Sequence, residues 1–107
     1  MEKLLDILDN PKWKLIAVDL DWTLCEWEFR WEWEPKPINK MINYINELYF
    51  SGGHIIIYTA RSPDFFRVTF SWLIKFWVCF HWIAMQMKPW ADLYIDDKSL
   101  HITNIKC

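Results

Sequence analysis

The sequence predicts an α/β fold built around a parallel β-sheet. Two apolar runs, 15–20 and 54–59, lack the polar alternation of a half-exposed strand, which is typical of strands buried on both faces. A segment with helical spacing of apolar residues follows each run. The resulting order β–α–β–α–β indicates parallel strands joined by right-handed crossovers. With 107 residues, 53% of them hydrophobic, the chain has the size and composition of one globular domain.

The first helix is expected over 38–50, after the prolines at 35 and 37. Its apolar face carries Ile38, Met41, Ile42, Ile45, Leu48 and Tyr49. Its other face carries Asn39, Lys40, Asn43, Asn46 and Glu47. The helix is expected to end at Ser51-Gly52-Gly53.

The second helix is expected to follow Ser62, an N-cap residue, with Pro63 in the first helical position. It should run to residue 76, and its inner face should carry Phe66, Thr69, Phe70, Leu73 and Phe76. A short strand is expected near 78–80 and a longer one over 91–96.

Composition and charge argue against several classes of protein. The chain has 12 Lys and Arg against 14 Asp and Glu, so its net charge of −2 gives no electrostatic case for nucleic acid or an anionic membrane. Its cysteines, Cys25, Cys79 and Cys107, fit neither a disulfide framework nor zinc-ligand spacing. The N-terminus lacks a signal-peptide core, and the most apolar stretch, 65–87, is interrupted by charges. We therefore expect a soluble, cytoplasmic protein with no membrane partner.

Polar side chains gather at or near the carboxyl ends of the three main strands. In chain order they are Asp19, Asp21, Thr59, Arg61, Lys88, Asp96 and Asp97. In an open parallel sheet these strand ends line one crevice, and ligands bind there. Residues far apart in the sequence should therefore meet at one site.

The charges in that crevice predict its ligands. Its four carboxylates would repel one another at close range unless a cation neutralised them. An all-oxygen site favours Mg²⁺, which commonly shares its coordination with a substrate phosphate. Thr59 and Lys88 supply a hydroxyl and a cation for the remaining phosphate oxygens. The predicted cofactor is Mg²⁺ and the predicted partner is a phosphorylated substrate.

Asp19 and Asp21 are two residues apart, so they point to the same side of an extended strand. One carboxylate can attack phosphorus and form an aspartyl-phosphate. The other can protonate the leaving oxygen and later activate water. A lone Asp-x-Asp pair is weak evidence, and the acidic pair at 96–97 alone is also typical of a solvated turn. Their combination at three strand ends is what favours phosphoryl transfer.

These residues resemble the motifs of the haloacid dehalogenase (HAD) superfamily of phosphohydrolases. The first family motif, a hydrophobic run followed by Asp-x-Asp-x-Thr or Val, is similar to residues 16–23. The Thr or Ser of the second motif is similar to Thr59, the Lys of the third to Lys88, and the acidic pair of the fourth to residues 96–97. The stretches 55–61 and 91–98 also resemble a small capless subgroup labelled capsule-biosynthesis phosphatase-like.

The resemblance implies a role for each residue. Asp19 would be the nucleophile and a Mg²⁺ ligand, and Asp21 the general acid/base, with its backbone carbonyl also on the metal. Thr59 and Lys88 would hold the phosphoryl group. Arg61, beside the second motif, would contact substrate.

The resemblance extends to the metal site and the fold. Asp96 would be the main metal ligand of the acidic pair, and Asp97 would orient a metal-bound water. The fold would be a three-layer Rossmann-like core in a single domain over 1–107, most of it within 14–102. Only a flap at 22–36 precedes the first helix, so there is no large cap domain. Such an open site would admit a phosphosugar, a nucleotide or the end of a macromolecule.

Other functions stay open at this point. A catalytically weak HAD-like accessory module that binds phosphate and metal would carry the same residues. A phosphotransfer receiver domain is disfavoured, because the second strand ends in Thr59 and the acidic pair comes last. The aromatic stretch 65–82 indicates core packing and is also compatible with a homo-oligomer interface.

Tryptophan is in excess and glycine is scarce. The chain has 9 Trp and 2 Gly, where average usage predicts roughly seven glycines. Trp22 stands inside the first motif and Trp77 follows the second helix, both places where glycine is common. Others at turn-like places are Trp27, Trp33, Trp82 and Trp90. The hypothesis is that tryptophan replaces several turn glycines, whether naturally, by design or through a sequence error, and an intact-mass measurement tests the last.

Overall fold

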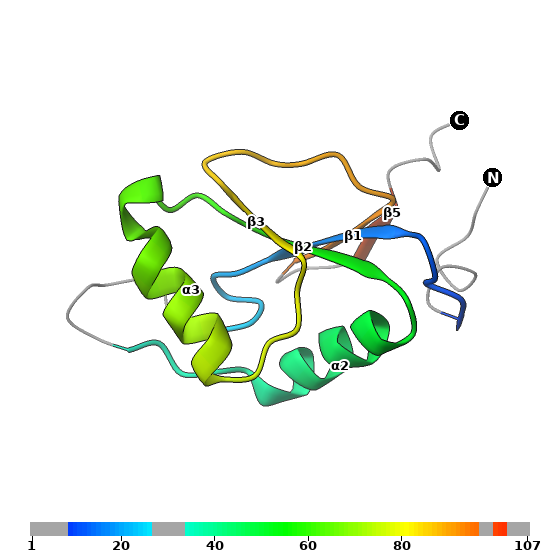
Figure 1. Ribbon diagram of the computed structural model, residues 1–107, viewed down its shortest axis with the longest axis horizontal. Helices are drawn as coiled ribbons and strands as arrows, with labels where there is room; N and C mark the ends of the chain where they lie inside the picture. Colours follow the sequence, from blue (N-terminus) through cyan, green and yellow to red (C-terminus); the bar gives the residue numbers. More distant parts are fainter. Residues whose placement is uncertain (1–8, 27–33, 97–99, 103–107) are drawn as a thin grey trace.

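Parallel strands lie at the centre of the protein. The computed structural model describes residues 9–26, 34–96 and 100–102. Strands β1 (Leu15–Asp19), β2 (His54–Thr59), β3 (Trp82–Met85) and β4 (Leu93–Ile95) run parallel, and β5 (Leu100–Ile102) pairs antiparallel with β4. The order in the sheet is β3-β2-β1-β4-β5 (Figure 1). The predicted α/β fold with a parallel sheet is therefore confirmed.

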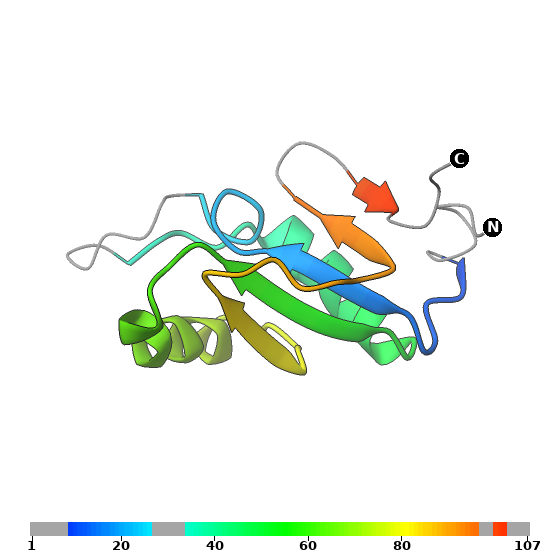
Figure 2. The ribbon, with the colours of Figure 1, turned by 90° about the horizontal axis from the view of Figure 1, so that it is seen from above.

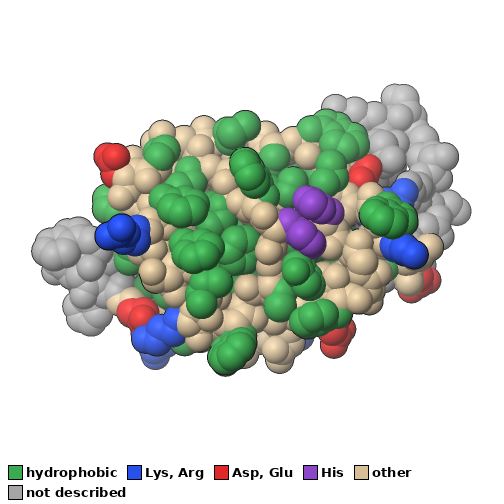
Figure 3. Space-filling model, viewed as in Figure 1, with side chains coloured by type: hydrophobic (Ala, Val, Ile, Leu, Met, Phe, Trp, Pro, Cys, Tyr) green, Lys and Arg blue, Asp and Glu red, His purple; other side chains and the backbone are tan. Residues whose placement is uncertain are grey.

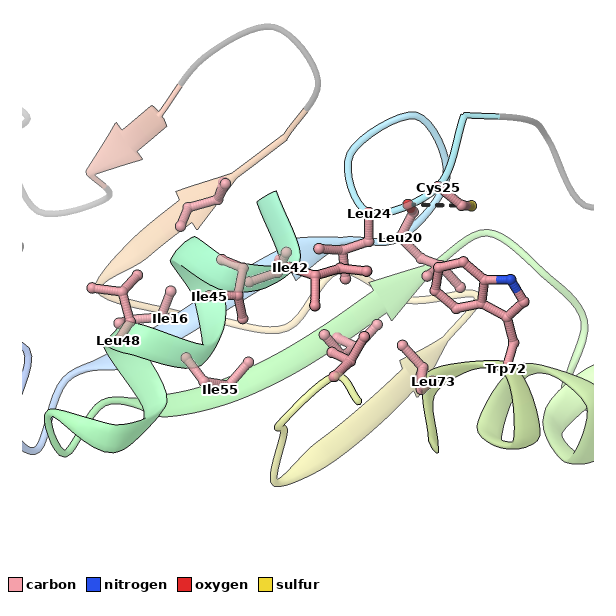
Figure 4. Packing of buried hydrophobic residues seen from close by; sticks show 14 of the residues in the cluster. Ile16, Leu20, Leu24, Cys25, Ile42, Ile45, Leu48, Ile55, Trp72 and Leu73 are labelled. Carbon is pink, nitrogen blue, oxygen red and sulfur yellow. Dashed lines mark hydrogen bonds between the residues drawn. The ribbon is translucent and has the colours of Figure 1, made fainter. Parts of the chain in front are cut away.

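Two helices pack on one face of this sheet. Helix α2 (Asn39–Phe50) connects β1 to β2, while the 3₁₀ turn η1 (Pro63–Phe65) and helix α3 (Phe66–Lys75) connect β2 to β3. Side chains of both helices join the strands in one hydrophobic cluster (Figure 4), which includes Ile16, Val18, Ile42, Ile45, Leu48, Ile55, Ile57, Trp72, Leu73, Leu93 and Ile95. The connection from β3 to β4 crosses the opposite face without a helix (Figure 2). In a three-layer fold a helix would lie on this face. Here the connecting segment 86–92 lies there instead.

The two apolar runs become the central strands because both of their faces are covered. Ile16, Ala17 and Val18 of β1 are completely buried, as are Ile55 and Ile57 of β2. A parallel strand with hydrogen-bonded neighbours on both sides and no solvent-exposed face needs such an uninterrupted apolar run.

Helix α2 has the predicted extent to within one residue, and Ile42, Ile45 and Leu48 are its buried side chains. Asn46, which the sequence places on the polar face, bonds to the segment that follows α3. Its Nδ2 donates to the carbonyl of Trp77 at 2.8 Å. This side chain is therefore a tertiary contact rather than part of a solvated face.

The strand expected near 78–80 is wrong, because β3 lies at Trp82–Met85. The residues after α3 first complete the helix end, and the N–H of Val78 still donates to a carbonyl of that helix. Pairing with β2 begins only at His81, whose N–H donates to the carbonyl of Ile55 at 2.9 Å. The strand near 91–96 is confirmed in a shorter form, Leu93–Ile95.

Helix α3 packs on the sheet with a different face from the one predicted, as if it were rotated about its axis. Thr69 and Leu73 are buried as expected, but Trp72 is buried with them while Phe66 and Phe70 are 47% and 41% exposed. The two phenyl rings stack on each other with centroids 5.8 Å apart. Figure 3 shows hydrophobic side chains gathered over this part of the surface. The rotation follows from Trp72, whose indole N–H donates to a backbone carbonyl of the segment before α2.

The segment between β1 and α2 spans only 20–38, so no large cap domain is inserted there, as predicted. Within the described residues, neither helix has the length and apolar character needed to cross a bilayer.

Candidate functional site

The register of the sheet brings the polar strand ends together. Val18 of β1 pairs with Ile95 of β4, so Asp19 and Asp96 follow paired residues on neighbouring strands. On the other side of β1, Asp19 itself pairs with the residue before Thr59. The carboxyl ends of β1, β2 and β4 therefore meet at one edge, as the sequence predicts.

Two hollows lie at this edge, and Asp19 lines both of them. The first, called the Lys88 hollow, has a volume of about 440 Å³ and is lined by Asp19, Tyr58, Thr59, Ala60, Gln86, Met87 and Lys88. The second, called the Arg61 hollow, has a volume of about 420 Å³ and is lined by Asp19, Asp21, Trp22, Ala60, Arg61, Ser62 and Phe65. Asp19 is thus the acidic residue common to both sides of the site.

Asp21 forms a two-point ion pair with Arg61. Arg61 Nη2 donates to Oδ1 of Asp21 at 2.7 Å, and Nε donates to Oδ2 at 3.3 Å. The planar guanidinium matches the two oxygens of the carboxylate in this way. The charge of Asp21 is therefore met by Arg61, which changes the expectation of four mutually repelling carboxylates.

Arg61 is also held from the helix side. Its Nη1 donates to Oγ1 of Thr69 at 2.9 Å, and Thr69 is completely buried on α3. Only 7% of the Arg61 side chain is exposed, against 21% for Asp21. The sequence predicts Arg61 as a substrate contact, and the structure places its guanidinium between Asp21 and Thr69.

Thr59 links the same two residues. Its hydroxyl donates to Oδ2 of Asp21 at 3.3 Å and accepts from the backbone N–H of Arg61 at 3.2 Å. The residue is buried at the end of β2. The hydroxyl proton, expected to reach a phosphate oxygen, points in this structure to Asp21, so a bound phosphate would compete with that carboxylate for it.

Cys25 also lies next to Asp21. Its Sγ is 3.6 Å from Oδ1 of Asp21 and 3.7 Å from the carbonyl of Leu20, the second contact being drawn in Figure 4. Burial, followed by the nearby charge of Asp21, raises the pKa of Cys25 to about 12. The thiol therefore stays protonated near neutral pH and acts as a weak donor rather than a nucleophile.

Lys88 is exposed and is oriented by the strand beside it. Its Nζ lies 4.6 Å from the ring centroid of Tyr94 on β4. The hydroxyl of Tyr94 donates to the carbonyl of Pro89 and accepts from the N–H of Ala91, which fixes the turn after Lys88. Sequence patterns do not reveal Tyr94 as part of the site, because it reads as an ordinary strand residue.

The loop after β1 is tightly bonded to itself. The carbonyl of Leu20 accepts from the N–H of Leu24, and the N–H of Trp22 donates to the carbonyl of Cys25. Trp22 has φ +70°, in the left-handed region that favours glycine. Thr23 is buried, and its hydroxyl has no hydrogen-bond partner within the described part of the chain. Residues 27–33 of the predicted flap lie outside the described residues.

The donors at this edge fit a hard cation only in part. Within residues 9–26, 34–96 and 100–102, no three His, Cys, Asp or Glu side chains form a metal-binding cluster. Asp19 and Asp96 are neighbours in register and offer the oxygen ligands that Mg²⁺ prefers. The backbone carbonyl of Asp21 is a third oxygen donor of the expected set, and Asp97 lies outside the described residues. The set is therefore compatible with Mg²⁺ that keeps several waters.

Besides Tyr94, sequence reasoning missed two further residues that organise the site. Thr69 reads as a core position of the second helix, although its hydroxyl binds Arg61. Gln86 lines the Lys88 hollow with φ +57°, and its N–H donates to the carbonyl of Thr59 at 2.8 Å. No local pattern identifies either role, because both depend on which strands and helices become neighbours.

Comparisons with other proteins bear on the fold. No protein-family model matches the chain, and no curated protein matches it either. It is similar to a crystal structure described as an MCSG target from Vibrio cholerae, with a TM-score of 0.60 and 27% sequence identity over 72% of each chain. That description names no activity, so the similarity supports the α/β architecture alone.

Proposed function

We propose that this protein is a Mg²⁺-dependent phosphohydrolase of the HAD type, cleaving a phosphate monoester through an aspartyl-phosphate. The observation that carries the proposal is the position of Asp19. It lines both a hollow that holds Thr59 and Lys88 and a hollow that holds Asp21 and Arg61. A carboxylate nucleophile needs phosphate-binding groups and an acid/base that can both reach the phosphate ester it attacks.

In the first step, an oxygen of Asp19 attacks phosphorus while the bond to the leaving oxygen breaks. Protonated Asp21 gives its proton to that oxygen, so the leaving group departs as an alcohol, and Arg61 pairs with the carboxylate that remains, as in this structure. In the second step, water attacks the aspartyl-phosphate and transfers a proton to Asp21. The bond between phosphorus and Asp19 breaks, inorganic phosphate is released, and both side chains return to their starting states.

The remaining groups stabilise charge. Lys88 and the hydroxyl of Thr59 would bind phosphoryl oxygens, with Lys88 acting as a point charge. Bound Mg²⁺, held by Asp19, Asp96 and the carbonyl of Asp21, with Asp97 orienting one of its waters, would neutralise charge on the phosphoryl group. The site has no cap over it among the described residues, so we propose phosphosugars, nucleotides or phosphorylated macromolecular ends as the substrate class.

The test is phosphate release from 4-nitrophenyl phosphate with and without Mg²⁺. We expect hydrolysis that disappears on adding EDTA, returns with Mg²⁺, and falls by about 10³-fold or more in Asp19→Asn. Asp9→Asn is the matched control, because Asp9 is exposed and lies before the amino end of β1. Full activity in Asp19→Asn, or activity insensitive to EDTA, would contradict the proposed mechanism.

A second candidate function is supported by Trp22. This side chain is 48% exposed and lines the Arg61 hollow beside Asp19. A bulky ring at that place favours an accessory module that binds phosphate and Mg²⁺ with little turnover. Calorimetric binding of inorganic phosphate that requires Mg²⁺, with no hydrolysis across a panel of phosphosugars, nucleotides and aryl phosphates, would identify the module and exclude the enzyme.

A further inference from the structure

We propose that Arg61 is a positioning residue that ties the carboxylate of Asp21 to helix α3 through Thr69, and so sets where the leaving group receives its proton. This inference rests on the proposed phosphohydrolase function and adds a residue pair that the motifs do not include. Arg61 and Thr69 act through Asp21, without contact with the substrate.

The first support is the geometry of the guanidinium. Nε and Nη2, which lie on one edge, donate to the two oxygens of Asp21, while Nη1 donates away from that edge to Thr69. Three of the five N–H groups of Arg61 are thus aimed at these two residues. Because the guanidinium is rigid and planar, fixing Nη1 on Thr69 also fixes the edge that binds Asp21.

The second support is burial. Arg61 lines the Arg61 hollow, but only 7% of its side chain is exposed and its donors are directed at Asp21 and Thr69. A buried charge is costly unless it is paired and hydrogen-bonded, and Asp21 and Thr69 provide those partners. The arrangement is therefore typical of a group that orients its neighbour rather than one that reaches for a ligand.

The third support is the position of Thr69, the residue that anchors Arg61. Thr69 is completely buried on α3, one turn before Leu73, which is also completely buried in the core. Asp21, in contrast, belongs to a loop next to the left-handed Trp22. Thr59 closes the arrangement, since its hydroxyl contacts both Asp21 and the N–H of Arg61. Thr69 therefore holds Arg61, and through it Asp21, from outside the loop that carries Asp21.

The consequence appears in the dependence on the leaving group. An alkoxide is a poor leaving group and needs a well-placed acid, whereas 4-nitrophenolate departs with little help from a proton. Misplacing Asp21 should therefore slow alkyl phosphates much more than 4-nitrophenyl phosphate. A variant that is partly unfolded would hydrolyse both substrates more slowly, by the same factor.

The experiment compares glycerol phosphate with 4-nitrophenyl phosphate in Thr69→Val, Thr69→Ser and Arg61→Lys. We expect Thr69→Val and Arg61→Lys to lower kcat for glycerol phosphate by about 10²-fold, with a far smaller loss for the aryl substrate and little change in KM. Thr69→Ser keeps the hydroxyl and should preserve the wild-type ratio of the two rates. Ser71→Ala, at an exposed position of the same helix, is the matched control.

Each outcome decides between the inferences. Equal losses on both substrates, or none, in folded Thr69→Val and Arg61→Lys would overturn the positioning role and leave the proposed function standing. Absence of hydrolysis of both substrates by the wild-type chain would overturn the proposed function instead. If Thr69→Val does not fold by circular dichroism, Arg61→Lys carries the test, and a normal ratio in that variant contradicts the inference.

Discussion

The two helices end in the same turn, built from different residues. At the end of α2, Gly52 N–H donates to the carbonyl three residues back and Gly53 N–H to the carbonyl five residues back. At the end of α3, Trp77 and Val78 make the same two bonds at the same two spacings. Both are Schellman turns with a left-handed residue, φ +100° at Gly52 and φ +60° at Trp77. One turn uses the residue that suits this backbone and the other uses a bulky residue that rarely adopts it.

The comparison indicates that contacts from outside the helix stabilise this turn even where the residue does not favour its backbone conformation. The carbonyl of Gly52 accepts from the N–H of Trp13 at 3.1 Å, and the carbonyl of Trp77 accepts from Asn46 Nδ2 at 2.8 Å. Each left-handed residue is thus bonded from outside its own helix. For an L-residue this backbone costs about 1–2 kcal/mol, which the bonds at Trp77 must offset.

The same conformation recurs at two other tryptophans. Trp13 and Trp22 have φ +69° and φ +70°, so three tryptophans among the described residues hold backbone that favours glycine. This supports the hypothesis of replaced turn glycines at Trp22 and Trp77. Trp82 and Trp90 are not left-handed, so the backbone does not support it there. Trp27 and Trp33 lie outside the described residues.

The largest effect should come from removing the contact that holds the Trp77 turn. Asn46→Ala deletes the bond to the Trp77 carbonyl and the one that Asn46 Oδ1 accepts from the N–H of Cys79 at 2.8 Å. We expect the free energy of unfolding to fall by about 2–3 kcal/mol, because both backbone groups lose their partner. Urea denaturation measures this free energy. The control is Asn43→Ala, at an exposed position of the same helix. Equal losses in both variants would show that helix propensity, rather than the turn, is affected.

A smaller loss should follow from placing a side chain at the glycine turn. In Gly52→Ala the new Cβ would lie 3.0 Å from Cγ and 3.2 Å from Cα of Lys12, on backbone with φ +100°. We expect the protein to lose about 2 kcal/mol of stability from strain and crowding together. Ser51→Ala changes the preceding residue, whose φ of −86° suits any side chain. A melting temperature unchanged in Gly52→Ala would mean that this turn tolerates a side chain as the Trp77 turn does.

The comparison also explains what could be predicted from the sequence. The runs at β1 and β2 and the apolar face of α2 are local patterns, and the structure follows them closely. The position of β3 and the rotation of α3 depend on tertiary contacts, such as the bonds of Asn46 and the indole of Trp72 to residues 31 to 37 positions away. A pattern of apolar residues carries no information about such bonds.

The candidate site also has features that local patterns predict and features that depend on tertiary contacts. Asp19, Asp21, Thr59, Arg61 and Lys88 could be placed together from the sequence, because parallel strands bring their carboxyl ends to one edge. The pairing of Asp21 with Arg61 could not, because it depends on where Thr69 lies once α3 has packed on the sheet. Side-chain direction at the site is thus set by the helix layer, whereas residue identity is set by the strands.

The smallest effect, and the one of opposite sign, should come from restoring glycine at the second turn. Trp77 is 82% exposed, so Trp77→Gly removes little buried apolar surface. The substitution removes the strain of a left-handed tryptophan but increases the conformational entropy of the unfolded chain. The net gain in the free energy of unfolding should be about 0.5–1 kcal/mol. Trp90→Gly is the matched control, because Trp90 is 60% exposed and its φ is not positive. That variant should lose stability, since glycine brings only the entropic cost. Equal gains at both positions would trace the effect to loss of an exposed ring rather than to backbone strain at the end of α3.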